Sequence, residues 1–177
     1  MSQPITALVI MGVAGCGKSS VSEALCNRNG AIQIEGDSFH PAANIEKMSA
    51  GIPLTDEDRA GWLDSLCEEL RRAVDSGERP VLTCSALKLR YRERLRGAVD
   101  GLGFVFLELT PQVAAERVTH RPGHFMPSTL IDSQFATLES PTGEPLVLTL
   151  DATKMDIDEL ANAAVVWWDK HKVPATS

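Results

Sequence analysis

The clearest pattern along the chain is a series of short apolar runs separated by longer stretches in which apolar residues recur at helical spacing. The runs are continuous rather than alternating, which is typical of parallel strands that helices cover on both faces. The stretches between them are long enough to hold crossover helices. We therefore expect five strands, at about residues 7–11, 31–35, 80–84, 104–109 and 146–150.

The most regular helical pattern runs from about residue 56 to residue 76, behind a possible cap at Thr55 and ahead of Gly77. A second helix is predicted to begin at Thr110 and Pro111, because proline suits the first helical position. A third covers about residues 156–172. With no internal repeat and no long linker, the 177 residues are expected to form one α/β domain.

Composition and charge narrow the classes of function. The chain is 44% hydrophobic and carries a net charge of -7, which argues against a nucleic-acid binder with a basic surface. Residues 1–11 have no basic segment and too short an apolar run for a signal peptide or a membrane span, so we expect a cytoplasmic protein. The four cysteines show no metal-binding spacing and are interpreted as reduced thiols.

A phosphate-binding motif follows the first predicted strand and opens a helix. Residues 12–19 read GVAGCGKS, which satisfies GxxxxGK[ST] in the context that the motif requires. Backbone N–H groups in such a loop cradle phosphates, Lys18 reaches the β- and γ-phosphate oxygens, and the Ser19 hydroxyl ligates Mg²⁺. The residues that we expect around ATP are Gly12, Val13, Ala14, Gly15, Cys16, Gly17, Lys18, Ser19 and Ser20.

A carboxylate follows the second predicted strand. Glu35, Gly36 and Asp37 stand where parallel strands end, and this is the edge at which open α/β sheets bind ligands. Asp37 is suited to accept the proton of an attacking hydroxyl and to orient Mg²⁺-bound water during phosphoryl transfer, although a turn or cap role is the alternative. A GTPase is disfavoured because the chain has no Asn-Lys-x-Asp element for reading guanine.

Ordered blocks of residues resemble the small gluconokinases. They are GDSFHP at 36–41, NIEKM at 44–48, GIPLTD at 51–56, Asp58-Arg59, Trp62-Leu63, CSALK at 84–88, Tyr91-Arg92, Leu95-Arg96, GHFM at 123–126, SQF at 133–135, TLE at 137–139 and Pro141. The resemblance implies the three-layer P-loop kinase fold, in which helices flank a five-stranded parallel sheet beside a small lid. It also implies transfer of phosphate from ATP to D-gluconate in a cytosolic homodimer.

The acceptor is a polyol with a carboxylate, so its site needs hydrogen-bonding groups and at least one local cation. Similarity to shikimate kinases indicates Arg59 as that cation, whereas pairing with Asp56 or Asp58 is the alternative. Each of the other candidates has a packing, capping or surface alternative. The substrate residues that we expect are Asp37, His40, Arg59, Ser85, Lys88, His124 and Gln134.

A lid is predicted at about residues 117–127, between two helices. In related small kinases, lid arginines cover the transferring phosphoryl group or stack on adenine, which suggests Arg121 as a catalytic residue and Arg117 as a nucleotide contact. Pro122 stands where we expect a basic residue in many relatives. Two further interpretations stay open at this point, namely a P-loop kinase for another hydroxylated metabolite and a nucleotide-binding regulator without transfer activity.

Overall fold

The computed structural model describes residues 4–119 and 128–171. Within them, five strands form one sheet in the order β2-β3-β1-β4-β5, and every pair of neighbours is parallel. The strands are β1 (Ala7–Met11), β2 (Ile32–Glu35), β3 (Pro80–Thr83), β4 (Leu102–Glu108) and β5 (Val147–Asp151). All five predicted strands are present, so the predicted parallel α/β fold is confirmed.

Helices connect the strands. They are α1 (Lys18–Asn29), the 3-10 turn η1 (Gly36–Phe39), α2 (Ala42–Ser49), α3 (Asp56–Asp75), α4 (Leu89–Arg96), α5 (Pro111–Thr119), α6 (Ser128–Thr137) and α7 (Ile157–Lys170). The predicted helices at residues 56–76, 110 onward and 156–172 correspond to α3, α5 and α7. In the described part of the chain, no helix is long and apolar enough to cross a membrane.

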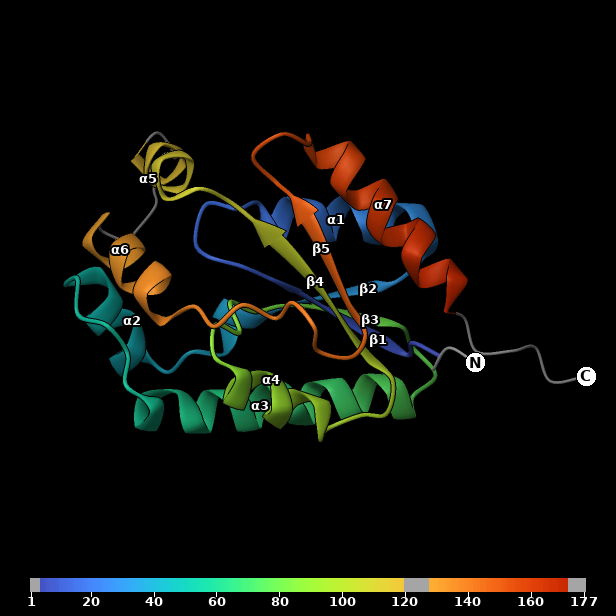
Figure 1. Cartoon of the computed structure of the whole chain (residues 1–177). Coiled ribbons are helices and arrows are strands. Elements are labelled where there is room, and N and C mark those ends of the chain that lie inside the picture. Colours follow the sequence, from blue (N-terminus) through green and yellow to red (C-terminus); the bar gives the residue numbers. More distant parts are fainter. Residues whose placement is uncertain (1–3, 120–127, 172–177) are drawn as a thin grey trace, which may run out of the picture.

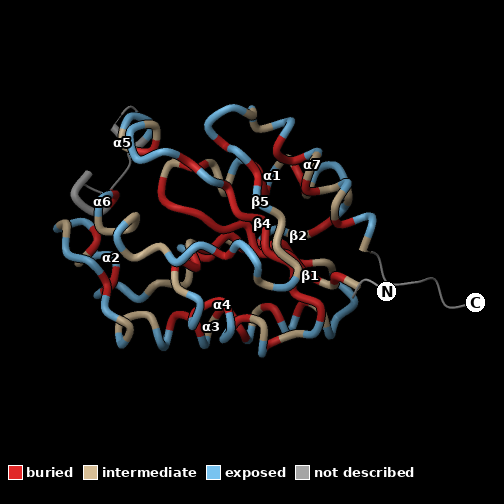
Figure 2. The backbone as a smooth tube through the Cα atoms, in the orientation of Figure 1, coloured by how far each residue is buried: buried red, intermediate tan, exposed pale blue. Residues whose placement is uncertain are grey.

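The sheet lies between two layers of helices, with α1 and α7 on one face and α3 and α4 on the other (Figure 1). One apolar cluster joins the sheet to α1 and α7, and a second joins it to α3 and α4. Figure 2 shows the resulting band of buried backbone through the central strands. Burial on both faces is why these strands read as continuous apolar runs in the sequence.

The carboxyl ends of the strands form the end of the sheet where a ligand can bind. The strand order reverses direction at β1, because the chain adds β2 and β3 on one side of this strand and β4 and β5 on the other. A crevice forms outside the carboxyl ends of strands at such a point. Helices α2, α5 and α6 gather at this end of the molecule (Figure 1). The predicted phosphate loop, residues 12–17, also lies here, between β1 and α1.

A buried arginine holds the chain between α6 and β5 against α4. The Arg92 side chain is fully buried and donates to Ala86 O at 2.8 Å, Glu139 O at 2.9 Å and Glu144 Oε2 at 2.6 Å. Arg96 adds a bond to Glu144 Oε1 at 2.8 Å. Burial alone would raise the pKa of the Glu144 carboxyl, but the bonds from the two arginines outweigh it and lower that pKa.

All four cysteines are free, as the sequence predicted. Cys16, Cys67 and Cys84 are buried, and Cys26 is half-buried. Burial raises the pKa of the Cys84 thiol to about 12, so it stays protonated at neutral pH.

Candidate active site

The phosphate loop has the backbone that its glycines allow. Gly12 and Gly17 have φ values of 147° and 94°, a region that side chains disfavour. A Cβ atom on Gly12 would lie 2.8 Å from both Cys16 Sγ and Leu107 O, so a larger residue would push the loop away from β4. Gly12 N also donates to Ser85 O at 3.3 Å, which ties the loop to the segment after β3.

Lys18 begins α1 and folds back over the loop. Its Nζ donates to Gly12 O at 3.0 Å and to Val13 O at 3.2 Å. These carbonyls hold the ammonium at the mouth of the loop, beside the N-terminus of α1. An anion at this mouth meets both a full positive charge and the positive end of a helix dipole.

Ser19 contacts a carboxylate that the sequence pattern did not single out. Its hydroxyl lies 2.8 Å from Glu35 Oε1 and 3.0 Å from Oε2, and Thr83 Oγ1 lies 2.7 Å from Glu35 Oε1. Glu35 is the last residue of β2, whereas the predicted site acid is Asp37, two residues later. The available signal was an acid at the carboxyl edge of a parallel strand, which applies to both residues.

These oxygens suit a hard divalent cation. Mg²⁺ in kinases takes one or two carboxylates together with substrate phosphates and water. Ser19 and Glu35 supply a hydroxyl and a carboxylate on one side, facing the loop that is shaped for phosphates. Among the described residues, no group of three or more His, Cys, Asp or Glu side chains forms a metal cage. The donor set therefore fits a metal that arrives with a nucleotide.

Asp37 lies in η1, directly after β2, with a side chain that is 66% exposed. Its position depends on Gly36, whose N–H donates to Thr83 Oγ1 at 3.2 Å and whose carbonyl accepts from Trp62 Nε1 at 2.8 Å. A Cβ atom on Gly36 would lie only 2.0 Å from Thr83 O. The backbone before Asp37 is thus fixed from both sides, while the carboxylate itself faces open space.

His40 packs beneath Asp37 rather than lining open space. Its side chain is 4% exposed and stacks on Trp62, with ring centroids 4.1 Å apart. Nδ1 lies 3.1 Å from Asn44 Nδ2, an amide donor, so Nε2 carries the ring proton and points toward Asp37 at 3.9 Å. Burial lowers the pKa of His40, against an opposing effect of Asp37. The ring therefore packs on Trp62, and the contact of His40 with the substrate stays a prediction.

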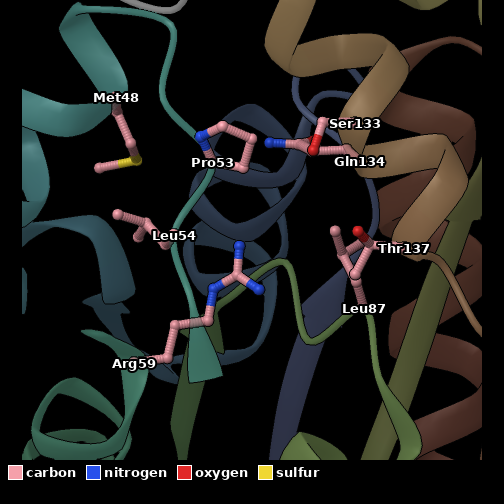
Figure 3. Close-up of a pocket in the computed structure, with 8 residues that line it drawn as sticks. All are labelled: Met48, Pro53, Leu54, Arg59, Leu87, Ser133, Gln134 and Thr137. Carbon is pink, nitrogen blue, oxygen red and sulfur yellow. The ribbon is translucent and has the colours of Figure 1, made fainter. Parts of the chain in front are cut away.

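Arg59 projects from α3 into a small pocket (Figure 3). The cavity is about 40 Å³, which is room for a few water molecules. Its guanidinium donates to Tyr91 Oη at 3.0 Å. The expected alternative partners are engaged elsewhere, because Asp56 pairs with Lys88 and Arg90 while Asp58 pairs with Lys47. The pocket is lined by Met48, Pro53, Leu54, Arg59, Leu87, Ser133, Gln134 and Thr137.

Gln134 connects this pocket to the phosphate loop. Its Oε1 accepts a hydrogen bond from Ala14 N at 2.7 Å, and the same side chain lines the pocket opposite Arg59 (Figure 3). Ser85, another predicted contact, meets the loop through its backbone carbonyl. Lys88 directly precedes α4, and its Nζ lies 2.9 Å from Oδ1 of Asp56, the first residue of α3.

Burial raises the pKa of the Cys84 thiol, and a backbone bond to Ala86 lowers it. Asp37 adds a smaller effect that raises this pKa, whereas Lys18 and Arg59 add smaller effects that lower it.

The predicted lid is only partly described. Arg117 is exposed on α5 and donates to Ala152 O at 3.0 Å, so it contacts the segment after β5. Arg121 and His124 lie outside the described residues.

Comparisons with known proteins agree with this geometry. The AAA domain family matches residues 8–145. A gluconokinase of Gluconobacter oxydans is 49% identical over 148 residues, which are 83% of each chain. The solved structure of a gluconokinase from Sinorhizobium meliloti is 46% identical, with a TM-score of 0.84 over 96% of this chain and 94% of that one. The unliganded structure of a sugar kinase from Janibacter is 39% identical, with a TM-score of 0.88 over 94% of this chain and 95% of that one.

Proposed function

The chain belongs to the gluconokinases and to the AAA domain family, and on that premise we propose that it transfers phosphate from ATP to D-gluconate. The products are ADP and 6-phospho-D-gluconate. The observation that carries this proposal is the arrangement of a phosphate loop, an exposed carboxylate after β2, and a pocket lined by Arg59 and by Gln134, which bonds to the loop at Ala14 N. These are the parts that phosphoryl transfer to an acidic alcohol needs.

Asp37 is the proposed general base. Its carboxylate is exposed at the mouth of the site, on a backbone that Trp62 and Thr83 hold in place. Phosphoryl transfer depends mainly on placing the attacking hydroxyl in line with the phosphate and on neutralising charge. Asp37 would accept the proton of the 6-hydroxyl as the new O–P bond forms and the bond to ADP breaks.

Lys18 and the loop amides are the proposed phosphate ligands. In the structure Lys18 rests on two loop carbonyls, and reaching a γ-phosphate requires it only to exchange these weak acceptors for a charged one. Gln134 occupies the Ala14 amide at 2.7 Å, and we propose that it contacts the acceptor beside the phosphate.

Mg²⁺ is the proposed metal, and Ser19 with Glu35 would hold it. Bound there with ATP, the ion would neutralise charge on the phosphate oxygens. The Ser19 hydroxyl would then turn a lone pair toward the metal, while Glu35 keeps its bond to Thr83. Glu35 is thus assigned to the metal and Asp37 to the acceptor hydroxyl, two separate tasks for two neighbouring acids.

Arg59 is the proposed anchor for the acceptor carboxylate. A planar guanidinium binds a carboxylate with two parallel hydrogen bonds, which fixes the orientation of the chain of hydroxyls. The pocket of about 40 Å³ is too small for the whole six-carbon acid. We therefore expect its walls on α2 and α6 to separate on binding, and a lid carrying Arg117, Arg121 and His124 to close afterwards and exclude water.

The proposal extends to the assembly and the compartment, because the family resemblance implies a cytosolic homodimer. Light scattering on the purified chain checks the assembly: we expect twice the mass of the 177-residue chain. A monomer at all concentrations would remove this part of the proposal and leave the chemistry unaffected.

Product analysis tests the proposed reaction. The protein is incubated with ATP, Mg²⁺ and D-gluconate, and phosphorus NMR follows the γ-phosphate. We expect a new phosphomonoester whose signal is split into a triplet by two neighbouring protons, as attachment to the primary 6-hydroxyl requires. Shikimate and D-glucose serve as comparison acceptors. Absence of the monoester with gluconate, or faster product formation with another acceptor, would contradict the proposed function.

A further inference from the structure

The contacts behind Arg59 form a relay of hydrogen bonds. Arg59 Nη1 donates to Tyr91 Oη at 3.0 Å, and the Tyr91 hydroxyl in turn bonds to Asp56 Oδ1. Asp56 also accepts from Lys88 Nζ at 2.9 Å and from Arg90 Nη1 at 2.6 Å. Three donors therefore share one carboxylate, and Arg59 reaches it only through Tyr91.

The direction of each bond follows from the groups involved. A guanidinium can only donate, so the Tyr91 oxygen is the acceptor toward Arg59. The hydroxyl hydrogen is then available for Asp56. The bonds from Tyr91 and Lys88 lower the pKa of Asp56 to about 2, so this carboxylate is ionised at neutral pH and can only accept. Hydrogen bonds therefore run in one direction, from Arg59 to the Tyr91 oxygen and from the Tyr91 hydroxyl to Asp56.

Through the relay, Arg59 bonds to a neutral group rather than to a carboxylate. Lys88 and Arg90 pair directly with Asp56, whereas Arg59 meets a neutral hydroxyl. Arg59, Lys88 and Arg90 together carry three positive charges against the single charge of Asp56. This local excess stands in a chain whose net charge is -7, and Arg59 is the member of the cluster that lines the pocket (Figure 3). Such an excess favours an anionic ligand.

We propose that Tyr91, supported by Asp56, is a positioning residue that holds the Arg59 guanidinium toward the carboxylate of the acceptor. This role rests on the proposed function, and it explains how the site selects an acceptor that carries a carboxylate. Tyr91 is 4% exposed, and the Arg59 carbon Cζ lies 5.3 Å from the centre of its ring. The ring supports the guanidinium from one side while the hydroxyl fixes its rotation.

Positioning matters here because arginine is long and flexible. Holding its side chain before the ligand arrives removes the entropy loss that binding would otherwise carry. An arginine without the Tyr91 hydroxyl keeps its charge but samples more conformations. Binding of the acceptor weakens in consequence, whereas the chemistry of the bound complex changes little. The expected signature is a higher KM for gluconate with an unchanged kcat.

The test compares Tyr91→Phe with the wild type at varied gluconate and saturating ATP. The substitution removes one hydroxyl and keeps the ring. We expect KM for gluconate to rise roughly 10-fold, the size of a lost hydrogen bond to a charged group, with kcat and KM for ATP within about twofold. KM does not depend on the amount of folded enzyme, so a loss of stability alone would not move it.

Arg90→Gln is the matched control. Arg90 binds the other oxygen of Asp56 and its side chain is 67% exposed, so the substitution removes one charge from the cluster but keeps the bonds from Arg59 to Tyr91 and from Tyr91 to Asp56. We expect its KM for gluconate within about twofold to threefold of the wild type. An equal rise in both variants would show that the loss of any bond to Asp56 weakens gluconate binding, and it would overturn the specific positioning role of Tyr91.

Tyr91 is the single tyrosine of the chain, which gives a direct readout. In protein labelled with ¹³C-tyrosine, one set of ring signals reports on the relay, and we expect gluconate to shift it in the wild type. An unmoved signal together with an unchanged KM in Tyr91→Phe would overturn the positioning role. Failure of the wild type to phosphorylate gluconate would instead overturn the proposed function, so the two failures are distinguishable.

Discussion

Gly36 shows how a single residue connects the fold to the site. Its backbone passes so close to β3 that a Cβ atom would lie 2.0 Å from the carbonyl oxygen of Thr83. The next residue is Asp37, the proposed base. A side chain at this position therefore disturbs both the sheet edge and the carboxylate that acts there.

We predict that Gly36→Ala lowers the free energy of unfolding by about 1–3 kcal/mol, the usual cost of overpacking, because the backbone of β3 cannot move aside without breaking its ladder. Urea denaturation measures this effect. Gly61→Ala is the control, since a Cβ atom on Gly61, in α3, would have no neighbouring atom within 4 Å. Alanine at position 61 should raise the free energy of unfolding by up to about 1 kcal/mol, because alanine favours the helix more than glycine does. Equal effects at the two glycines would refute the close contact.

At the scale of elements, α3 depends on its first turn. Thr55 Oγ1 accepts from Asp58 N at 3.1 Å, and Asp58 Oδ2 accepts from Thr55 N at 2.9 Å, which is a capping box. We predict that Thr55→Ala costs about 1 kcal/mol in urea denaturation at pH 7. Ser65→Ala in the same helix removes a hydroxyl that donates only to Gly61 O, one turn earlier and away from the helix end, so it should be neutral or slightly stabilising.

The same turn gives a pH dependence. Bonds from Lys47 and from the Thr55 backbone lower the pKa of Asp58 from 3.8 to about 2. A depressed pKa in the folded state contributes stability above the unfolded value and loses it as pH falls through the folded value. The stability difference between wild type and Asp58→Asn should therefore be full at pH 5 and shrink between about pH 4 and pH 2. A constant difference over that range would contradict the stabilising role of the ionised Asp58 carboxylate in its bonds to Lys47 and to the Thr55 backbone.

The buried arginine of α4 is a second element-scale contact. We predict that Arg92→Met lowers the free energy of unfolding by about 3–5 kcal/mol, because it leaves the Glu144 carboxylate and two carbonyls without their main donor. Thermal or urea unfolding measures the loss. Arg94→Met is the control on the same helix, since Arg94 is 53% exposed in a surface pair and should matter by less than about 1 kcal/mol. Similar losses of unfolding free energy in the two variants would contradict the claim that the buried Arg92 contributes more to stability than the exposed Arg94.

At the scale of the whole molecule, the sequence was sufficient for the sheet and the phosphate loop because both depend on local pattern. Continuous apolar runs indicated the five strands, and GVAGCGKS stands between a strand and a helix. The partner of Ser19 was not predictable in this way. Glu35 stands at the end of β2, and β3 lies between β2 and β1, a strand order that no local sequence pattern specifies.

The substrate side was predicted less completely for the same reason. Arg59 was selected by resemblance, but its partner Tyr91 lies 32 residues later and meets it through the packing of α3 against α4. His40 was selected for its place after β2. Its ring stacks on Trp62 of α3, and its contact with the substrate stays a prediction. Packing between elements that are distant in the sequence decides which side chains near the carboxyl ends of the strands face the ligand site. Arg121 and His124, outside the described residues, stay predictions.

The central claim is that Asp37 takes the proton of gluconate while the phosphate loop holds ATP. It is tested most directly by gluconate-dependent ADP release in Asp37→Asn, with Asp75→Asn, an exposed acid at the end of α3, as the control. We predict a fall in kcat of roughly 10² or more for Asp37→Asn and an unchanged rate for Asp75→Asn. A wild-type rate in Asp37→Asn would contradict the account.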